Sequence, residues 1–261
     1  MALTKITGAG VEGVTISSTT DVSDQFILTN TDTGSSSGPD LVLFRQSTSS
    51  AADSDGIGRI DFRGLNDANE EINYATTYSK ISDASDGTED GEFYIQQISG
   101  GSYVTTLKID GTGAVTKPLQ PAFSLFYDSS GTEGVGNNNT VVFTGVHSNI
   151  GTHYNTSTGK FTAPVSGFYH FNLVAFGSNS SGGAVSAGSS SAISLYDWTN
   201  SATLARSYHY TQTGSFHPNM SFSSAHYLSA STEVSIVPGS GSYLYSDASD
   251  LYCKFSGFLI G

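Results

Sequence analysis

Residues 154–175, YNTSTGKFTAPVSGFYHFNLVA, decide the fold of this chain. Thr158-Gly159 is a turn signal, because glycine adopts a positive φ without steric cost. Beyond this turn apolar residues recur at every second position, which is typical of strands with one face in a core. These residues are Phe161, Ala163, Val165, Tyr169, Phe171, Leu173 and Ala175. Pro164 and Gly167 interrupt the pattern, so we predict a strand, a sharp corner and a second, longer strand.

The same stretch resembles the globular head of the C1q and tumour-necrosis-factor superfamily. That family carries a Tyr, a short turn and then Gly-Lys-Phe-Thr-Ala-Pro-x-x-Gly-x-Tyr-x-Phe, which this chain matches in order over 154–171. Further matches are PAFSLF (121–126), VVFTGVHSN (141–149), HYLSASTEVSIV (226–237) and FSGFLIG (255–261). The third of these departs from the family, because Ser231-Thr232-Glu233 replaces the usual Gly-Asp. The resemblance implies a ten-strand jelly-roll sandwich over 122–261 that assembles as a homotrimer.

The composition of the whole chain indicates an all-β protein. Charged residues make up 13% of the chain, against about a quarter in ordinary proteins, and no long segment repeats apolar residues at helical spacing. The net charge of −13 argues against a nucleic-acid partner, which would require clustered Lys and Arg. No apolar run approaches the roughly 20 residues of a membrane span, and no signal peptide is evident. We therefore expect a soluble chain that does not insert into membranes and is not secreted by the ordinary route.

The two halves of the chain have different surfaces, which predicts a domain boundary between them. Residues 1–118 carry a net charge of −10, and residues 119–261 carry a net charge of −3. The segment KPLQP (117–121) contains two prolines, which stiffen the backbone and prevent a ladder from continuing. We place a linker at 118–121, between a β-rich region at 24–117 and the head at 122–261.

The region 24–117 is predicted to form short strands separated by Gly-rich turns, beginning with the apolar runs 26–28 and 41–44. Its segments GRIDFRG (58–64), YSKISDASDGTEDGEFYI (78–95) and TLKIDGTGAV (106–115) resemble parts of bacteriophage tail fibres and other virion fibres. The strands carry too few apolar residues to bury a core in one chain, so three chains around an axis would complete one another's sheets. The arm 1–23 is then either a virion anchor or a loose extended segment.

Asp86 and Asp90 belong to the densest acidic cluster and, with Thr88 and Gly91, imitate the start of an EF-hand calcium loop. The twelfth position is Gln97, where that loop requires a bidentate Glu. A calcium site at Asp86 and Asp90 is therefore a weak hypothesis beside a solvated Asp-Gly turn, and no other cofactor is predicted.

Catalysis is not expected from this sequence. Cys253 alternates with Leu251 and Phe255, which predicts a small buried residue on the closing strand rather than a nucleophile. The six histidines show no metal-ligand spacing, and the one Gly-x-Ser-x-Gly match, GSSSG (34–38), lies in a Ser- and Gly-rich connector rather than between a strand and a helix. We therefore predict that the protein is not an enzyme.

Two aromatic-rich segments of the head predict a ligand-binding surface. The segments 207–227 and 239–250 interleave aromatic rings with short polar residues, a combination suited to sugar and protein recognition. The candidate ligand-binding residues are Tyr208, Tyr210, His217, Tyr243 and Tyr245. The alternative is that many of these aromatics alternate into the core of strands. The loops carry little charge, so a neutral or polar glycan suits them better than an acidic polymer.

These patterns together predict a structural virion protein of a bacteriophage, assembled in the host cytoplasm. The main hypothesis is a trimeric tail fibre whose head binds a glycan or protein of the host surface and whose N-terminal region contacts other virion proteins. The alternatives are a capsid head fibre or decoration protein and a soluble C1q-like lectin.

Overall fold

The structure is a computed structural model that describes residues 27–260, apart from 32, 36–37, 47–48, 129–138 and 246–251. The predicted arm 1–23 lies outside these residues. All regular elements within the described ranges are β-strands, which confirms the all-β prediction. No helix in this part of the chain is long and apolar enough to cross a membrane.

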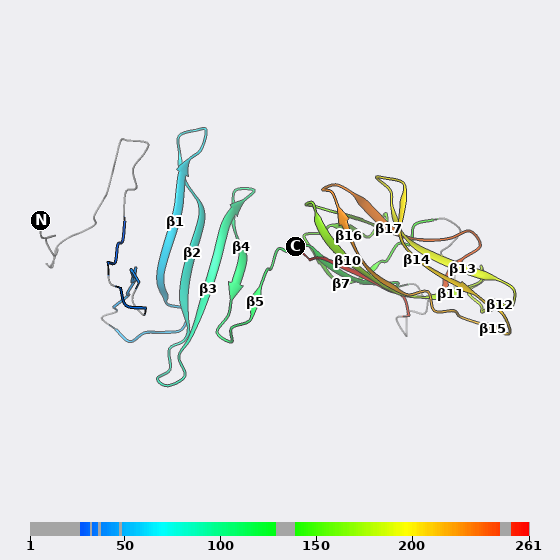
Figure 1. Cartoon of the computed structure of the whole chain (residues 1–261), viewed down its shortest axis with the longest axis horizontal. Helices are drawn as coiled ribbons and strands as arrows, with labels where there is room; N and C mark the ends of the chain where they lie inside the picture. Colours follow the sequence, from blue (N-terminus) through cyan, green and yellow to red (C-terminus); the bar gives the residue numbers. More distant parts are fainter. Residues whose placement is uncertain are drawn as a thin grey trace, which may run out of the picture.

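The first five strands form an antiparallel sheet in sequence order, which we call the N-terminal sheet (Figure 1). Its strands are β1 (Gly56–Leu65), β2 (Glu71–Asp83), β3 (Asp90–Ser99), β4 (Ser102–Ile109) and β5 (Val115–Thr116). The apolar run 41–44, expected to be a strand, forms no ladder, and its side chains are exposed. The physical reason is that its apolar residues find no partner strand among the described residues.

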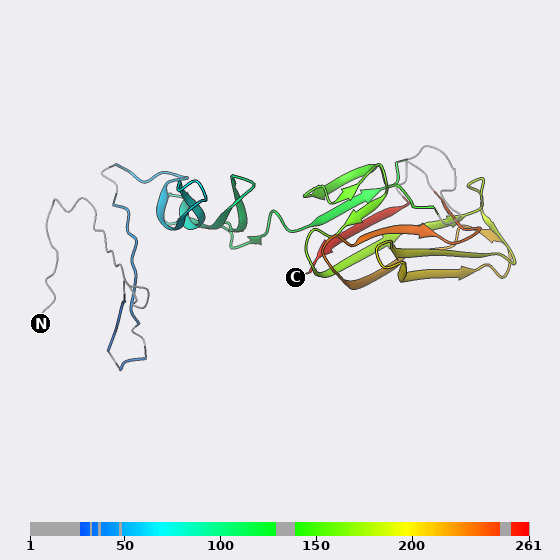
Figure 2. The ribbon, with the colours of Figure 1, turned by 90° about the horizontal axis from the view of Figure 1, so that it is seen from above.

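The N-terminal sheet has one apolar face and one polar face, because its strands alternate. Ile60 and Phe62 of β1 lie on the same face as Phe93 and Ile95 of β3, and all four remain 37% to 57% exposed. This sheet forms a single layer, and the segment 117–121 separates it from the strands that follow (Figure 2). Apart from Leu43, which lies against Gly58, the described residues leave the apolar face uncovered.

Ten of the remaining strands form a sandwich of two five-stranded antiparallel sheets, in agreement with the predicted ten-strand jelly roll (Figure 2). The front sheet has the order β16 (Phe222–Leu228), β10 (Gly167–Val174), β19 (Lys254–Leu259), β6 (Ala122–Phe126) and β7 (Gly145–Ile150). The back sheet has the order β14 (Ala202–Tyr210), β13 (Ser190–Asp197), β17 (Glu233–Pro238), β9 (Lys160–Thr162) and β8 (Tyr154–Asn155).

Two short ribbons extend the sandwich at the end away from the N-terminal sheet (Figure 1). They pair β11 (Phe176–Ser178) with β18 (Tyr243–Tyr245), and β12 (Val185–Ser186) with β15 (Ser215–Phe216). We call this the distal end. These ribbons are the part of the head that lies farthest from β1–β5 along the long axis of the molecule (Figure 1).

The predicted strand, corner and strand over 160–174 carry the chain from one sheet of the sandwich to the other. β9 belongs to the back sheet and β10 to the front sheet, and Ala163 between them exchanges backbone hydrogen bonds with Ser231 and Thr232. Gly159 closes the preceding turn at φ +72°, and a Cβ there would lie 2.4 Å from the Val141 carbonyl oxygen. Glycine is therefore required at this position on two grounds.

The alternating residues of this stretch fill the core between the sheets. Phe161, Tyr169, Phe171 and Leu173 are fully buried, together with Phe255 from the closing strand. Val165 is the exception, because it follows Pro164 at the corner, outside either strand, and is half-exposed. The prediction that Val165 lies in the core is therefore wrong, while the prediction for its six neighbours is confirmed.

Candidate functional site

The outer face of the back sheet carries a line of exposed aromatic and cationic side chains. Arg206, Tyr208 and Tyr210 point outward from the edge strand β14, and the two tyrosines are 64% and 52% exposed. Ladder pairing sets Arg206 opposite Ser194, Tyr208 opposite Ala192 and Tyr210 opposite Ser190 of β13. The small residues on β13 leave the tyrosine rings uncovered on that side.

A hollow of about 280 Å³ lies at one end of this line. Tyr196, Trp198 and Arg206 line it, together with residues of β17. The rings of Tyr196 and Trp198 meet edge to face at 4.9 Å. We call Tyr196, Trp198, Arg206, Tyr208 and Tyr210 the back-sheet strip.

Contacts with Ser235 and Lys160 hold the Trp198 ring in a fixed position beside the hollow. Its indole Nε1–H donates a hydrogen bond of 2.7 Å to Ser235 Oγ, and Lys160 Nζ lies 5.0 Å from the ring centroid. Lys160 in turn pairs with Glu233 at 2.7 Å. A rigid, partly exposed indole beside a guanidinium offers a flat apolar face and hydrogen-bond donors at the same place.

The family of the head is settled by comparison with known protein families. Residues 122–260, more than half of the chain, match the family model described as the C1q domain. The chain belongs to the C1q domain family. No protein of the curated set matches it.

Two solved structures are similar to this C1q domain. The globular domain of zebrafish complement 1qA is 21% identical, with a TM-score of 0.42, and the match covers 54% of this chain and 98% of that one. The tumour necrosis factor Eiger from S. frugiperda is 11% identical, with a TM-score of 0.44, and the match covers 54% of this chain and 93% of that one.

The five candidate residues chosen from the sequence fall into two groups in the C1q domain. Tyr208 and Tyr210 lie on strand β14 rather than on loops, and they belong to the back-sheet strip. His217, Tyr243 and Tyr245 lie at the distal end, where the His217 and Tyr245 rings are 4.0 Å apart. His217 Nδ1 also lies 3.0 Å from the Gly177 carbonyl oxygen. These rings are partly buried against one another and present less free surface than the strip does.

Sequence reasoning missed Tyr196, Trp198 and Arg206. The signal was present, because Trp198 is the sole tryptophan of the chain and follows Tyr196 by two positions, which puts both rings on one face. Arg206 alternates with Tyr208 and Tyr210, so its outward direction also follows from period two. Its place beside Tyr196 depends on the pairing of Arg206 with Ser194, two residues before Tyr196 on β13.

The proposed metal residues lie outside the C1q domain. Asp86 is in the exposed turn between β2 and β3, and Asp90 begins β3 opposite Asp83. No group of three or more His, Cys, Asp or Glu side chains placed to hold an ion occurs in the described ranges. The calcium hypothesis stays a prediction.

Cys253 is enclosed by the ribbon residues of the C1q domain. It is buried, and its Sγ lies 2.9 Å from the Tyr245 carbonyl oxygen. Burial raises the pKa of the Cys253 thiol to about 11, so the thiol stays protonated near neutral pH. A buried and protonated thiol is a poor nucleophile.

We expect Cys253 to resist thiol reagents in the folded protein. At about pH 8, a thiol with its pKa raised this far is almost entirely protonated and also shielded from the reagent. Titration with a chromogenic disulfide should give no free thiol before denaturant is added and one thiol per chain afterwards. Rapid labelling of the native protein would contradict the buried position.

Proposed function

We propose that this protein is a homotrimeric, non-enzymatic C1q-like binding protein whose head recognises a neutral or polar glycan through the back-sheet strip. C1q and tumour-necrosis-factor-like domains are non-enzymatic binding modules, and they commonly form homotrimers. The observation that carries the proposal is the strip itself. It sets Trp198, Tyr196, Tyr208 and Tyr210 on one outer face, where Arg206 and the neutralised Lys160–Glu233 ion pair are the neighbouring charges.

The front sheet supports the proposed trimer, because its outer face is suited to contact another chain. Phe168, Tyr227, Phe258 and Ile260 are each about half exposed at its linker-proximal end. The neighbouring outward positions on β10, β16, β19 and β6 are mostly Ser, Ala and Asn, and Lys254 is the single Lys, Arg, Asp or Glu on these four strands. A flat, aromatic and charge-depleted face is typical of the centre of a protein interface.

The proposed trimer interface and the back-sheet strip lie on opposite faces of the sandwich. The front sheet would face the other chains, and the back sheet would face the surroundings. Three strips per molecule would then act together, and linked weak sites gain avidity without new contacts.

A bacteriophage virion fibre, either a tail fibre that binds the host surface or a capsid head fibre, is the second candidate. The comparisons with known proteins give it no support. The observation that favours it is the single-layered N-terminal sheet, whose apolar face needs other chains to cover it. Immunogold labelling of purified virions with an antibody to this chain distinguishes the virion fibre from the C1q-like binding protein. Gold on tails or capsids would show that the chain is part of the virion.

We expect Trp198→Ala and Tyr208→Ala to weaken glycan binding roughly ten-fold or more, since truncating a central aromatic anchor costs at least about 1.4 kcal/mol. The labelled full-length protein is first screened on immobilised neutral and acidic oligosaccharides, and the variants are then titrated against the best neutral one. Tyr74→Ala in the N-terminal sheet is the matched control, because Tyr74 is also exposed.

Unchanged binding by both strip variants, with loss in Tyr243→Ala, would move the site to the distal end. Binding of no neutral glycan by the unmodified protein would overturn the proposed ligand class. Equal loss in Tyr74→Ala would show that the effect is not local to the strip.

A further inference from the structure

The polar face of the N-terminal sheet concentrates positive charge in a protein of net charge −13. The chain has ten Lys and Arg residues, and four of them point from this one face: Arg59, Arg63, Lys80 and Lys108. The apolar residues Ile60, Phe62, Phe93 and Ile95 occupy the opposite face. A trimer that covers the apolar face would leave the cationic face open.

A row of directly opposed residues crosses four strands of this face. Arg59 pairs with Tyr78, Tyr78 with Tyr94, and Tyr94 with Lys108. The two tyrosine rings are stacked, with centroids 4.7 Å apart and planes within 3° of parallel. Lys80 Nζ lies 5.7 and 5.8 Å from the two ring centroids, and Lys108 Nζ lies 5.3 Å from the Tyr94 ring. The row is thus a stack of two tyrosine rings bordered by cations.

Carboxylates lie beneath these cations and hold them in position. Asp61 contacts Arg59 at 3.0 Å and Arg63 at 2.8 Å. The Asp61 side chain is 13% exposed, whereas those of Arg59 and Arg63 are 58% and 49% exposed. The hydrogen bond from Arg63, with those from Thr76 and Asn73, lowers the pKa of Asp61 to about 2, so the carboxylate stays charged. A ligand approaching this face meets the guanidinium groups first.

The second ion pair follows the same arrangement. Glu92 is 18% exposed and lies 2.6 Å from Lys108, which is 32% exposed. Hydrogen bonds to Glu92 and Tyr94 raise the pKa of Lys108 and keep it cationic. Glu71 is the exception, because it is exposed at the outer edge of β2, where it pairs with Arg63 at 2.9 Å.

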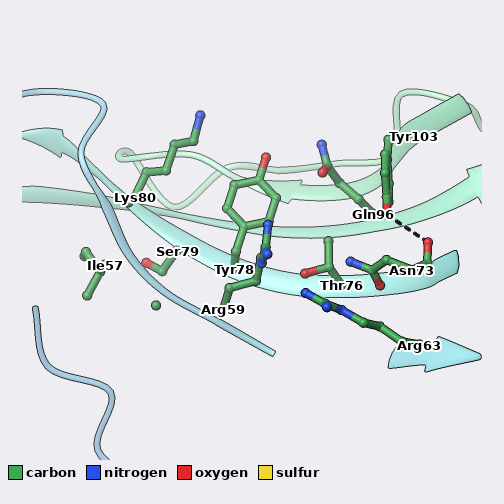
Figure 3. Close-up of a pocket in the computed structure, with 12 residues that line it drawn as sticks. Ile57, Arg59, Arg63, Asn73, Thr76, Tyr78, Ser79, Lys80, Gln96 and Tyr103 are labelled. Carbon is green, nitrogen blue, oxygen red and sulfur yellow. Dashed lines mark hydrogen bonds between the residues drawn. The ribbon is translucent and has the colours of Figure 1, made fainter. Parts of the chain in front are cut away.

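Part of this polar face lines an open groove of about 640 Å³ (Figure 3). Its described lining includes Arg59, Arg63, Tyr78 and Lys80 and no acidic residue. Gln96 and Tyr103 add hydrogen-bonding groups from β3 and β4, and Asn73 Oδ1 is buried without a hydrogen-bond partner among the described residues. The groove therefore combines cations, an aromatic ring and amides.

We propose that this groove is a second binding site, specific for an acidic oligosaccharide that carries carboxylates. A guanidinium binds a carboxylate through two parallel hydrogen bonds, which suits Arg59 and Arg63. Tyr78 adds an aromatic ring and a hydroxyl to the lining, which suit the C–H and hydroxyl groups of a sugar, and Gln96, Asn73 and Tyr103 supply further hydrogen-bonding groups. The excess of cations in the lining supplies the charge complementarity. This site differs from the back-sheet strip in location, charge and ligand.

The test uses the full-length protein, and the probe is trigalacturonic acid, an oligosaccharide of three galacturonic acid units. Binding is measured by isothermal titration calorimetry. The methyl-esterified form of this acid keeps the rings and removes the charges. We expect the acid to bind and the ester to bind roughly ten-fold or more weakly, because hydrogen bonds between charged groups are the stronger ones. Acetate at the same carboxylate concentration reports binding of the anion without the sugar.

Variants locate the site on the N-terminal sheet. Arg59→Gln and Tyr78→Ala should each weaken binding of the acid roughly ten-fold, with unchanged oligomeric state and circular dichroism. Lys117→Gln is the matched control, because it removes one exposed positive charge outside the groove. Arg59→Lys should restore little affinity, since lysine cannot make the paired contact.

Several results would overturn the proposal. They are no binding of the acid at millimolar concentration, equal binding of acid and ester, equal binding of acetate, or equal losses in Arg59→Gln and Lys117→Gln. If Arg59→Gln and Tyr78→Ala both alter the oligomeric state, the affinity of the Arg59→Lys variant for the acid decides whether the groove is a specific site. Full affinity with lysine at that position would show that only net charge matters and that the groove is not a specific site.

Discussion

Phe255→Ala is expected to lower the free energy of unfolding of the C1q domain by about 3–5 kcal/mol, the usual cost of removing a fully buried phenylalanine. The Phe255 ring is at the centre of the core. Its centroid lies 5.0 Å from that of Phe123, 5.6 Å from Phe143 and 6.1 Å from Phe171. The ring therefore joins residues of the front sheet to the segment before β7, and its loss leaves a cavity that these neighbours cannot fill without moving.

Urea denaturation at a fixed protein concentration measures this change, since the stability of an oligomer depends on concentration. Phe216→Ala is the control, because Phe216 is 40% exposed in β15, away from the front sheet. It should have a much smaller effect on the unfolding of the C1q domain. A loss below about 1 kcal/mol for Phe255→Ala would contradict the central position of this ring.

Phe258→Asp is expected to convert the proposed trimer into monomers. Phe258 lies on the outer face of the front sheet, opposite His170 on one side and Ala122 on the other. In a trimer built on this face, three carboxylates would be buried near one another, and an unpaired buried charge costs several kcal/mol. Light scattering should change from three times the chain mass of 27.3 kDa to the mass of one chain.

Thr156→Asp controls for the added charge, because Thr156 is exposed in the turn between β8 and β9. It should remain trimeric. A wild-type protein that is a stable monomer would contradict the trimer, and a Phe258→Asp protein that remains a trimer would move the interface away from the front sheet.

The core of the sandwich could be predicted from the sequence because it depends on local alternation. Tyr169, Phe171 and Leu173 alternate along one strand, and the strand geometry alone places them on one face. Val165 could not be placed in this way, because the corner after Pro164 ends the strand and the alternation no longer determines direction.

The proposed binding surface was less predictable, since it depends on how separate strands pair. Tyr208 and Tyr210 were found as exposed aromatics, but a one-residue shift of β14 would turn both rings inward. Arg206 lies beside Tyr196 because it pairs with Ser194 of β13, and no local pattern in either segment determines that pairing. The run 41–44 forms no strand for a related reason, since a strand requires a partner and the described residues offer none there.

The short segment between β5 and β6 has a consequence for assembly. Only residues 117–121 separate the N-terminal sheet from the head. In a trimer, the heads would hold three such sheets within the reach of five residues, so their association becomes an intramolecular step at a high effective concentration. A sheet too thinly apolar to fold alone can then form cooperatively with its two neighbours. The head would therefore act as the nucleus of assembly, and the N-terminal sheets would close last.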